Sequence, residues 1–522
     1  MSGKSSDQLH KLIHSLNKQE KRHFKIFAGR HTIGEQNNYV VLFDAVERMK
    51  EYDEEALLKK FSKELFINNF SITKGRLYET ILRSLDVFHH NSSVDAQLWK
   101  ELHYAEILYK KTLYEQCAKR LKSARKLAEK YEKYAVLVQI HSLEKTLAEK
   151  DSYAGMTEEH IMEILREDQE IADHMNTYNE LWNVKSRLFM MLNTKGPARG
   201  AEQFAEFKKL IDATLGSKSP ENLTVWSRFM YHHTYSAYYF AISDAENCHF
   251  HLAANVALIE ANTEIFSDEP NVYFGVLTNL IYVCSKLKRY KEVLINLNKL
   301  RALPEKLDTA RNEDLEMKLF ASAYSLELTL YNSIGRFDSA VALVPKIAEG
   351  LERFEGRISK LREAHFCISC AVALYGDGKL QQSLRWTSRL LNDTSIGKNE
   401  WIFAVAQVFS LILHIELDHR DLIPYTARSV QRYLKTRNRS FQFENVFLKF
   451  TEKVAKTADN SEMQPLYEEL NKQLIELEKD NFEKTAFEYF DFAAWAQAKV
   501  SGRSFRELIE EKAGVTEELG KP

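Results

Sequence analysis

The chain has very few glycines and prolines for its length. Its 522 residues include 18 glycines and 8 prolines, whereas average usage gives about 37 and about 26. A β-sandwich or an α/β enzyme needs these residues at most of its connections. Long helices joined by short polar turns need far fewer of them. The sequence therefore predicts an all-α fold.

Composition narrows the class of protein further. Apolar residues make up 44% of the chain and charged residues 28%, which suits large cores and excludes a disordered chain. The five cysteines are an odd, sparse set, as expected for reduced thiols in a cytosolic protein. The N-terminus lacks the apolar stretch of a signal peptide, and the most apolar run, Trp401–Leu413, is shorter than the roughly 20 residues that span a bilayer. We therefore expect a cytoplasmic protein with no membrane partner, in which this run is a buried helix.

Residues 1–93 are expected to form a compact, basic helical module. Asn17 followed by Glu20 has the pattern of a capping box, which predicts that a helix begins there. Asp53 is a favourable N-cap for a later helix, and apolar periodicity predicts a long helix over residues 71–89. A short Asn-Ser-Ser segment then ends the module.

Beyond about residue 96 the sequence predicts pairs of helices around short turns. Four segments can be aligned by their turns: 111–117, 287–293, 334–340 and 377–383. In each segment an aromatic residue or leucine follows a short linker, and a small or apolar residue follows three positions later. Looser copies are expected at Phe250 and Leu422, so that turns recur every 40 to 47 residues between these two positions.

This pattern resembles the tetratricopeptide repeat, a helix-turn-helix unit that stacks into a right-handed superhelix. The best copy matches the family at six positions: Tyr324, Leu328, Tyr331, Gly335, Phe337 and Ala340. The chain departs from the family's period of about 34 residues, lacks most of its closing prolines, and has no register over residues 150–225. The resemblance implies that residues 94–455 form a tetratricopeptide-like helical solenoid.

A solenoid of this kind needs polar caps at its ends. Residues 1–93 are expected to cap one end, and residues 456–522 are expected to form a C-terminal helical cap with an acidic tail. Helices are predicted there over residues 468–480 and 482–497. Five aromatic side chains are expected to dock on the last repeat: Phe487, Tyr489, Phe490, Phe492 and Trp495.

The resemblance also implies a binding face, because in this family the first helix of each unit lines the concave side. The turn alignment selects nine positions for it: Thr278, Tyr282, Lys286, Ser325, Thr329, Asn332, His365, Ile368 and Tyr375. Tyr282 and Tyr375 are the expected anchors, because a few aromatic residues usually dominate binding energy. The alternative is that these tyrosines only fill space between neighbouring first helices.

A second candidate surface is basic. The first 150 residues carry a net charge of +7 and the remaining 372 a net charge of −9. One predicted helix face carries Lys18, Lys21, Arg22 and Lys25, and a second basic helix carries Lys119, Arg120, Lys122, Arg125, Lys126, Lys130 and Lys133. Such stripes can contact the phosphates of nucleic acid. They are equally typical of a solvated outer face.

Motifs for metals and cofactors are incomplete. Gly29 and Gly34 have the spacing of a phosphate-binding loop, but a glutamate and a glutamine follow them where lysine and serine or threonine are required. Glu246 and His249 form a single E-x-x-H motif, whereas a di-iron site needs two.

The cysteines are expected to be packing residues. Cys367 and Cys370 form a lone C-x-x-C motif without further zinc ligands at a suitable spacing. Like Cys117 and Cys284, they fall on packing positions of the repeat, where a free cysteine behaves as a small apolar residue. We therefore expect no metal and no cofactor.

These observations favour a non-enzymatic scaffold or adaptor that binds another protein or a peptide on the concave face of the solenoid. The alternative is a regulator whose basic N-terminal module contacts nucleic acid while the solenoid senses a ligand. An enzyme with an all-helical pocket stays open as a third class, because a fold does not determine a function.

Overall fold

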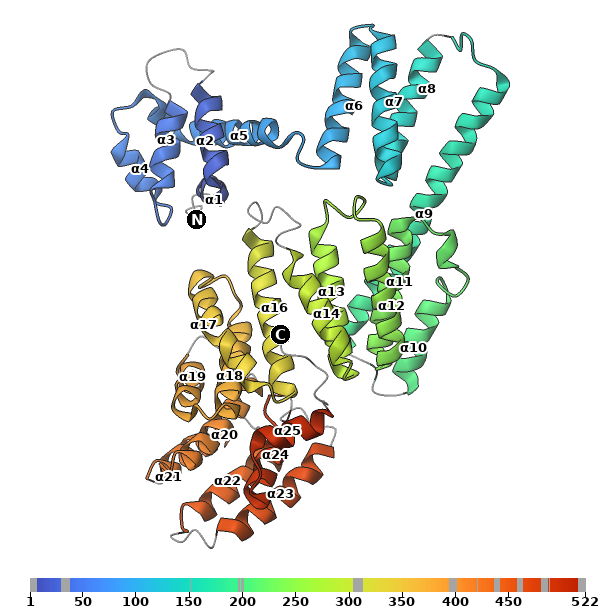
Figure 1. Ribbon diagram of the computed structural model, residues 1–522. Coiled ribbons are helices and arrows are strands. Elements are labelled where there is room, and N and C mark those ends of the chain that lie inside the picture. Colours follow the sequence, from blue (N-terminus) through green and yellow to red (C-terminus); the bar gives the residue numbers. More distant parts are fainter. Residues whose placement is uncertain are drawn as a thin grey trace. The chain divides into compact units, whose positions relative to one another are not determined.

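The computed structural model confirms an all-α chain (Figure 1). It describes residues 7–29, 38–150, 152–195, 198, 201–303, 313–393, 401–419, 421–435, 442–457, 463–479, 487 and 489–514. Within these residues there are 24 α-helices and no β-strand. The helices pack largely against their neighbours in sequence. The glycine-loop motif extends into residues 30–37 and the acidic tail covers residues 515–522, so both lie outside the described residues.

The chain divides into two compact units. Unit 1 consists of residues 1–194, 202–234 and 258–269, and unit 2 of residues 195–201, 235–257 and 270–522. The helices that belong mainly to unit 1 are α1 (Gln8–Ser15), α2 (Lys18–Gly29), α3 (Asn38–Glu47), α4 (Glu54–Lys60), α5 (Phe70–His89), α6 (Val94–Lys110), α7 (Tyr114–Lys130), α8 (Tyr134–Lys150), α9 (Glu158–Lys195) and α10 (Ala201–Asp212). Both units receive residues from α11 (Val225–Ala241) and α12 (Ala245–Ala261).

The helices of unit 2 follow one another in order (Figure 1). They are α13 (Pro270–Lys286), α14 (Tyr290–Arg301), α16 (Glu313–Ser333), α17 (Phe337–Arg353), α18 (Lys360–Gly376), α19 (Leu380–Asn392), α20 (Trp401–Glu416), α21 (Ile423–Lys435), α22 (Gln442–Val454), α23 (Met463–Lys479), α24 (Phe492–Ser501) and α25 (Phe505–Ala513). As predicted from its apolar run, α20 is buried along most of its length. Among the described residues, no helix combines the length and the apolar character that crossing a membrane requires.

The N-terminal helices begin where their caps predict. The side chain of Asn17 accepts hydrogen bonds from the backbone N–H groups of Gln19 and Glu20, both at 2.9 Å. The Glu20 carboxylate accepts from the N–H of Asn17 at 2.8 Å, which completes the capping box. The Asp53 side chain accepts from the N–H of Ala56 at 3.0 Å. The predicted boundary after residue 93 separates the hydrophobic cluster of α1–α5 from that of α6–α9.

The turns between paired helices share one backbone geometry. In the four aligned segments the turn residue has a positive φ: Thr112 (59°), Lys288 (55°), Gly335 (77°) and Gly378 (76°). The N–H of the next residue donates to the carbonyl five positions earlier at 2.8–2.9 Å in all four turns. This is the long hydrogen bond of a Schellman motif, which ends a helix and redirects the chain. The four predicted turns are therefore confirmed.

The two looser copies lie in a different register from the predicted one. The turn before α12 is centred on Ser243 and the turn after α20 on Asp418, both with a positive φ. Phe250 lies inside α12, and Leu422 immediately precedes α21. The aromatic signature fails in the first case because Ala245 occupies the position two residues after the turn.

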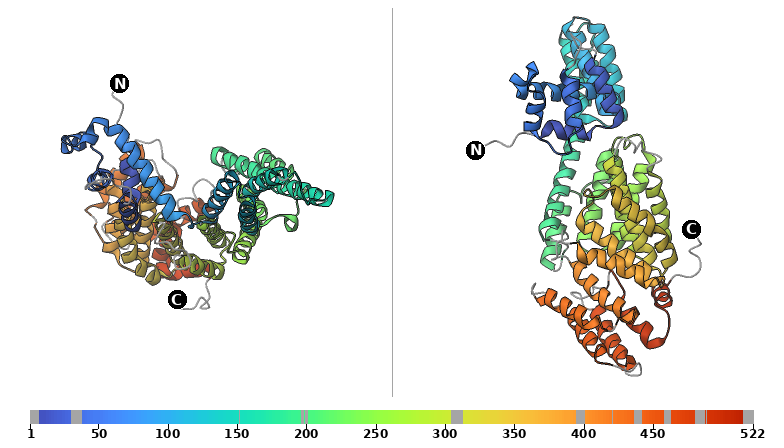
Figure 2. Two further views of the ribbon diagram at one scale, coloured as in Figure 1. Left: turned by 90° about the horizontal axis from the view of Figure 1, so that it is seen from above. Right: turned by 90° about the vertical axis from the view of Figure 1, so that its left-hand side faces the viewer.

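Three further features of the predictions have simple structural explanations. Residues 150–225 have no repeat register because α9 is one helix of 38 residues instead of a pair (Figure 2). The predicted helix over residues 482–497 lies partly outside the described residues. Within the described part, residues 489–491 are not helical and α24 begins at Phe492. The predicted boundary at residue 455 does not interrupt the core, because Phe447 and Tyr467 lie in one hydrophobic cluster.

Candidate binding face of unit 2

The first helices of successive pairs form a continuous row in unit 2. In this row α13 packs on α16, α16 on α18, and α18 on α20. The second helices, α14, α17 and α19, each pack on the first helix of the next pair. One close contact shows how tightly the pairs meet: a Cβ atom on Gly376 would lie 2.3 Å from the ring of Phe337. Only glycine leaves room for that ring.

The end of this row is covered by the C-terminal segment, which we define as residue 487 and residues 489–514. Ring centroids of Phe490 and Phe409 lie 4.8 Å apart, and those of Phe492 and Phe443 lie 4.7 Å apart. Trp495 is fully buried in the same cluster. The prediction that these aromatic side chains dock on the end of the helical array is confirmed. Their surroundings come from α18, α20 and α22 together, so the docking site is larger than one repeat.

One carboxylate holds the helix α24 of this segment. Glu416, on α20, accepts from the indole N–H of Trp495 and from the Lys499 ammonium, both at 2.7 Å. The Tyr375 hydroxyl donates to the same carboxylate at 3.4 Å. Burial, followed by the charge of Glu416, raises the pKa of Tyr375 well above its usual value. Tyr375 is therefore a neutral hydrogen-bond donor at this position.

The final helix, α25, lies across the turns of three successive pairs. The Lys288 ammonium in the first turn donates to the carbonyl of Lys512 at 3.4 Å. In the second turn, a Cβ atom on Gly335 would lie 2.6 Å from the Glu510 side chain. In the third turn, Asp377 accepts from the Arg506 guanidinium at 3.1 Å. This helix was not predicted, although Ser504 and Glu507 form the capping box at its start. The three turns that it contacts lie more than 120 residues away in the chain.

The predicted binding positions on α18 are mostly taken up by internal packing. Tyr375 is 9% exposed and contacts the rings of Phe490 and Phe505, with centroids 5.3 and 5.4 Å away. Ile368 is fully buried. The expectation that these two residues lie on an open face is wrong, because the core and the C-terminal segment enclose them. His365 is half-buried, and its ring lies 5.4 Å from that of Tyr489.

The predicted positions on α13 are accessible. Tyr282 is 44% exposed, and the Lys286 ammonium lies 5.6 Å from the centre of its ring. Such a distance is suitable for a cation–π interaction. Thr278 is half-buried, and its hydroxyl donates to the carbonyl of Gly275 at 2.9 Å. The alignment of the four turns thus correctly selects an exposed aromatic side chain, Tyr282, on the row of first helices.

The positions on α16 are polar and differ in exposure. Thr329 is exposed and Ser325 is half-buried. The Asn332 amide donates to the carbonyl of Ser369 on α18 at 2.9 Å. Its oxygen Oδ1 is buried and accepts no hydrogen bond within the described part of the chain. Asn332 therefore links two first helices and keeps an unused acceptor.

Half of the basic stripe on α2 pairs with acidic residues of α3. The Lys21 ammonium lies 3.2 Å from Glu47, and Lys25 lies 2.8 Å from Asp44 and 3.3 Å from Glu47. The hydrogen bond to Asp44 raises the pKa of Lys25. Lys18 and Arg22 are exposed. The structure thus supports only part of the stripe as a free cationic surface.

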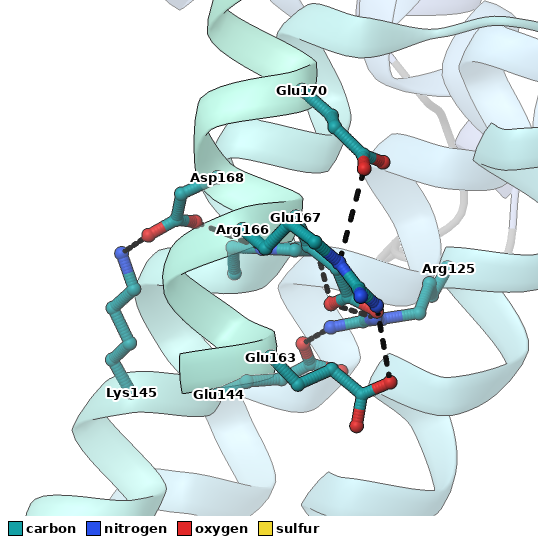
Figure 3. A network of polar contacts seen from close by, with 9 residues as sticks. Arg125, Glu144, Lys145, Glu163, Arg166, Glu167, Asp168 and Glu170 are labelled. Carbon is teal, nitrogen blue, oxygen red and sulfur yellow. Dashed lines mark hydrogen bonds and ion pairs between the residues drawn. The ribbon is translucent and has the colours of Figure 1, made fainter. Parts of the chain in front are cut away.

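Cations of the second basic helix, α7, also meet carboxylates of neighbouring helices. Arg125 donates to Glu167 at 2.8 Å and to Glu144, and it joins α7, α8 and α9 in one network (Figure 3). Burial opposes the charge of Arg125, but the bonds to these two glutamates raise its pKa overall. Further ion pairs join three other basic residues to acidic partners: Arg120 to Glu101, Lys130 to Glu264, and Lys133 to Asp95. Lys119, Lys122 and Lys126 are exposed.

All five cysteines are free thiols, and all are buried. Their burial matches the packing positions predicted for Cys117, Cys367 and Cys370, whereas the equally buried thiol of Cys284 also contacts the Glu292 carboxylate. Burial raises the pKa of Cys367 to about 11, so this thiol is protonated at neutral pH.

One group of side chains has the composition of a metal site. His249 on α12, Cys284 on α13 and Glu292 on α14 bring three potential ligand atoms within 4.8 Å of one another. The sequence shows Glu246 and His249 as an E-x-x-H motif, but Cys284 and Glu292 come from the next helix pair. Burial, with the charge of Glu292, raises the pKa of the Cys284 thiol to about 12.

Comparisons with known proteins return no match for this chain among protein-family models, curated proteins or solved structures. The resemblance to the tetratricopeptide repeat therefore stays a prediction from the residues.

Proposed function

We propose that unit 2 is a tetratricopeptide-like solenoid that binds a segment of another protein without chemical turnover. Three features support the solenoid: the recurring Schellman turns, the row of first helices, and the packing of each second helix on the next pair. Repeat proteins of this kind offer extended preformed surfaces for recognition.

The observation that carries the proposal is the way the chain's own C-terminal segment binds. Its aromatic side chains fill gaps on α18, α20 and α22, and its N–H donors meet Glu416. Apolar anchors with a few directed polar contacts are the usual chemistry of a protein-binding surface. The row of first helices can therefore hold a peptide-like segment through apolar anchors and a few directed polar contacts.

The part of this row that the segment leaves accessible is the proposed site for a partner. On α13 it offers the exposed ring of Tyr282 beside Lys286, and on α16 the exposed hydroxyl of Thr329. An aromatic ring and a cation with a polar neighbour suit an extended or helical segment that carries an apolar anchor and an acidic group.

Photo-crosslinking from defined positions tests this proposal. A photoreactive phenylalanine analogue at Tyr282 should give a discrete adduct with one protein in cells, because the face is occupied by its partner. The matched control places the same analogue at Ile295, which is 57% exposed but lies on the second helix α14. Adducts of equal yield from both positions, or none from Tyr282, would contradict the proposal.

A further inference from the structure

Three ligand atoms from three helices converge between two successive helix pairs of unit 2. Nε2 of His249 lies 2.6 Å from Oε2 of Glu292, and Sγ of Cys284 lies 3.7 Å from the same oxygen. Around a tetrahedral Zn²⁺ with bonds of about 2.0–2.3 Å, ligand atoms lie roughly 3.3–3.8 Å apart. The sulfur–oxygen distance already matches. The nitrogen–oxygen distance must widen by less than about 1 Å, which Glu292 permits because its side chain is 41% exposed.

The backbone fixes the position of the thiol. The carbonyl of Cys284 accepts the long Schellman hydrogen bond from the N–H of Arg289 at 2.9 Å. This bond sets where α13 ends and where α14 begins, and so it places Glu292 next to Cys284. The Cys284 side chain is fully buried, whereas His249 and Glu292 both reach solvent. An ion could therefore enter from the side of His249 and Glu292, which are both half-buried.

The charged groups around the three ligand atoms can neutralise a divalent ion. The Arg289 guanidinium lies 2.5 Å from Glu246, 3.5 Å from Glu292 and 3.2 Å from Nδ1 of His249. Two carboxylates and a thiolate would offset this guanidinium and a divalent cation together. Binding through Nε2 needs the imidazole proton on Nδ1, so the Arg289 nitrogen that lies 3.2 Å from Nδ1 and 3.4 Å from Nε2 must move away from the ring, while the bond to Glu246 can stay.

We propose that His249, Cys284 and Glu292 form a zinc site that joins α12 to the next helix pair. Thiolate, imidazole and carboxylate are all established ligands of Zn²⁺. Three protein ligands leave the fourth position to water. Metal binding replaces the thiol proton of Cys284, so binding releases one proton at neutral pH.

Cobalt substitution provides the direct test. The reduced full-length chain, treated with a chelator and then titrated with Co²⁺, should bind one equivalent with a near-ultraviolet thiolate-to-cobalt charge-transfer band. Stoichiometric Zn²⁺ should remove this band by displacement and raise the melting temperature, because it binds only the folded state. Binding of less than about 0.1 equivalent, or no charge-transfer band at saturating Co²⁺, would overturn the proposal.

Substitutions of the three proposed ligands test which side chains bind the metal ion. His249→Gln, Glu292→Gln and Cys284→Ser should each weaken Co²⁺ binding at least about tenfold, and Cys284→Ser should abolish the band. The matched control is Cys248→Ser, a buried thiol beside His249 that donates to the carbonyl of Ser236. It should keep the band. If circular dichroism shows that Cys284→Ser does not fold, His249→Gln and Glu292→Gln provide the test. Co²⁺ affinity equal to that of the wild type in both of these variants would refute the site.

Discussion

The indole N–H of Trp495 donates to Oε1 of Glu416 at 2.7 Å, although 79 residues separate the two in the chain. Trp495 is fully buried, and the Glu416 side chain is 13% exposed. Because Lys499 donates to the other oxygen at 2.7 Å, one carboxylate ties α24 to α20. This link closes the end of unit 2 with the chain's own C-terminal segment.

Replacing this carboxylate should destabilise unit 2. Glu416→Ala leaves the Trp495 N–H without its acceptor in a buried site, and we expect the free energy of unfolding to fall by about 2–3 kcal/mol. Urea unfolding monitored by circular dichroism measures this free energy. The control is Glu476→Ala, an exposed pair with Lys479 at 3.0 Å, which should change stability by less than about 0.5 kcal/mol. Equal effects of the two substitutions would argue against an anchoring role for Glu416.

Alanine substitutions of the two predicted anchor tyrosines should change the free energy of unfolding by different amounts. Tyr375→Ala removes a buried ring from the core and should lower the free energy of unfolding by about 3 kcal/mol. Tyr282→Ala removes a ring that is 44% exposed and should lower it by less than about 1 kcal/mol. Thermal melts of both variants give the comparison. A large drop for Tyr282→Ala would place its ring in the core and remove it from the proposed binding face.

Local signals in the sequence predicted the helices and their turns well. Asn17 and Asp53 cap helices at the predicted places, since a cap depends on residues only two or three positions away. The four aligned turns share a geometry that depends on about six consecutive residues. Tyr282 was found by counting from such a turn along one helix.

Long-range packing was the part that could not be predicted. Tyr375 lies three residues before its turn, like the half-buried Asn332 before its own, and the rings of Phe409 and of the distant Phe490 and Phe505 enclose it. The group of His249, Cys284 and Glu292 was missed for the same reason, because no short motif contains all three. Side chains that meet across helix pairs leave no fixed spacing in the sequence.

Two neighbouring histidines of unit 1 should make stability depend on pH. Burial lowers the pKa values of His232 and His233 from 6.5 to about 4. Both are neutral in the folded state, so between pH 6.5 and 4 the unfolded state binds more protons and stability falls as pH falls. Each should account for a loss on the order of 3 kcal/mol across this range.

Replacing His232 and His233 isolates their contribution to the pH dependence of stability. The double variant His232→Asn and His233→Asn should show a flatter fall of melting temperature between pH 6.5 and pH 4 than the wild type. His103, whose side chain is 67% exposed, serves as the control, and His103→Asn should leave the slope unchanged. An unchanged slope in the double variant would mean that other groups cause the pH dependence.

The nucleic-acid alternative can be tested on the accessible half of the basic stripe. Because Lys21 and Lys25 pair with acidic residues of α3, reversing them would also disturb the fold. Lys18→Glu with Arg22→Glu changes exposed side chains and should leave the melting temperature within about 2 °C. If the stripe binds nucleic acid, this variant abolishes a salt-sensitive gel shift. No shift of the wild type at low salt would exclude the alternative.

Alanine substitutions of two glycines in equivalent turns distinguish the cost of local backbone strain from the effect of α25 docking on stability. Gly335 and Gly378 have φ values of 77° and 76°, so alanine at either position costs about 1 kcal/mol through backbone strain. A Cβ atom on Gly335 would also lie 2.6 Å from the Glu510 side chain, whereas nothing lies within 4 Å of one on Gly378. Gly335→Ala should therefore lower stability by about 1 kcal/mol more than Gly378→Ala and speed amide hydrogen exchange in α25. Equal losses and unchanged exchange would mean that α25 does not rest on this turn.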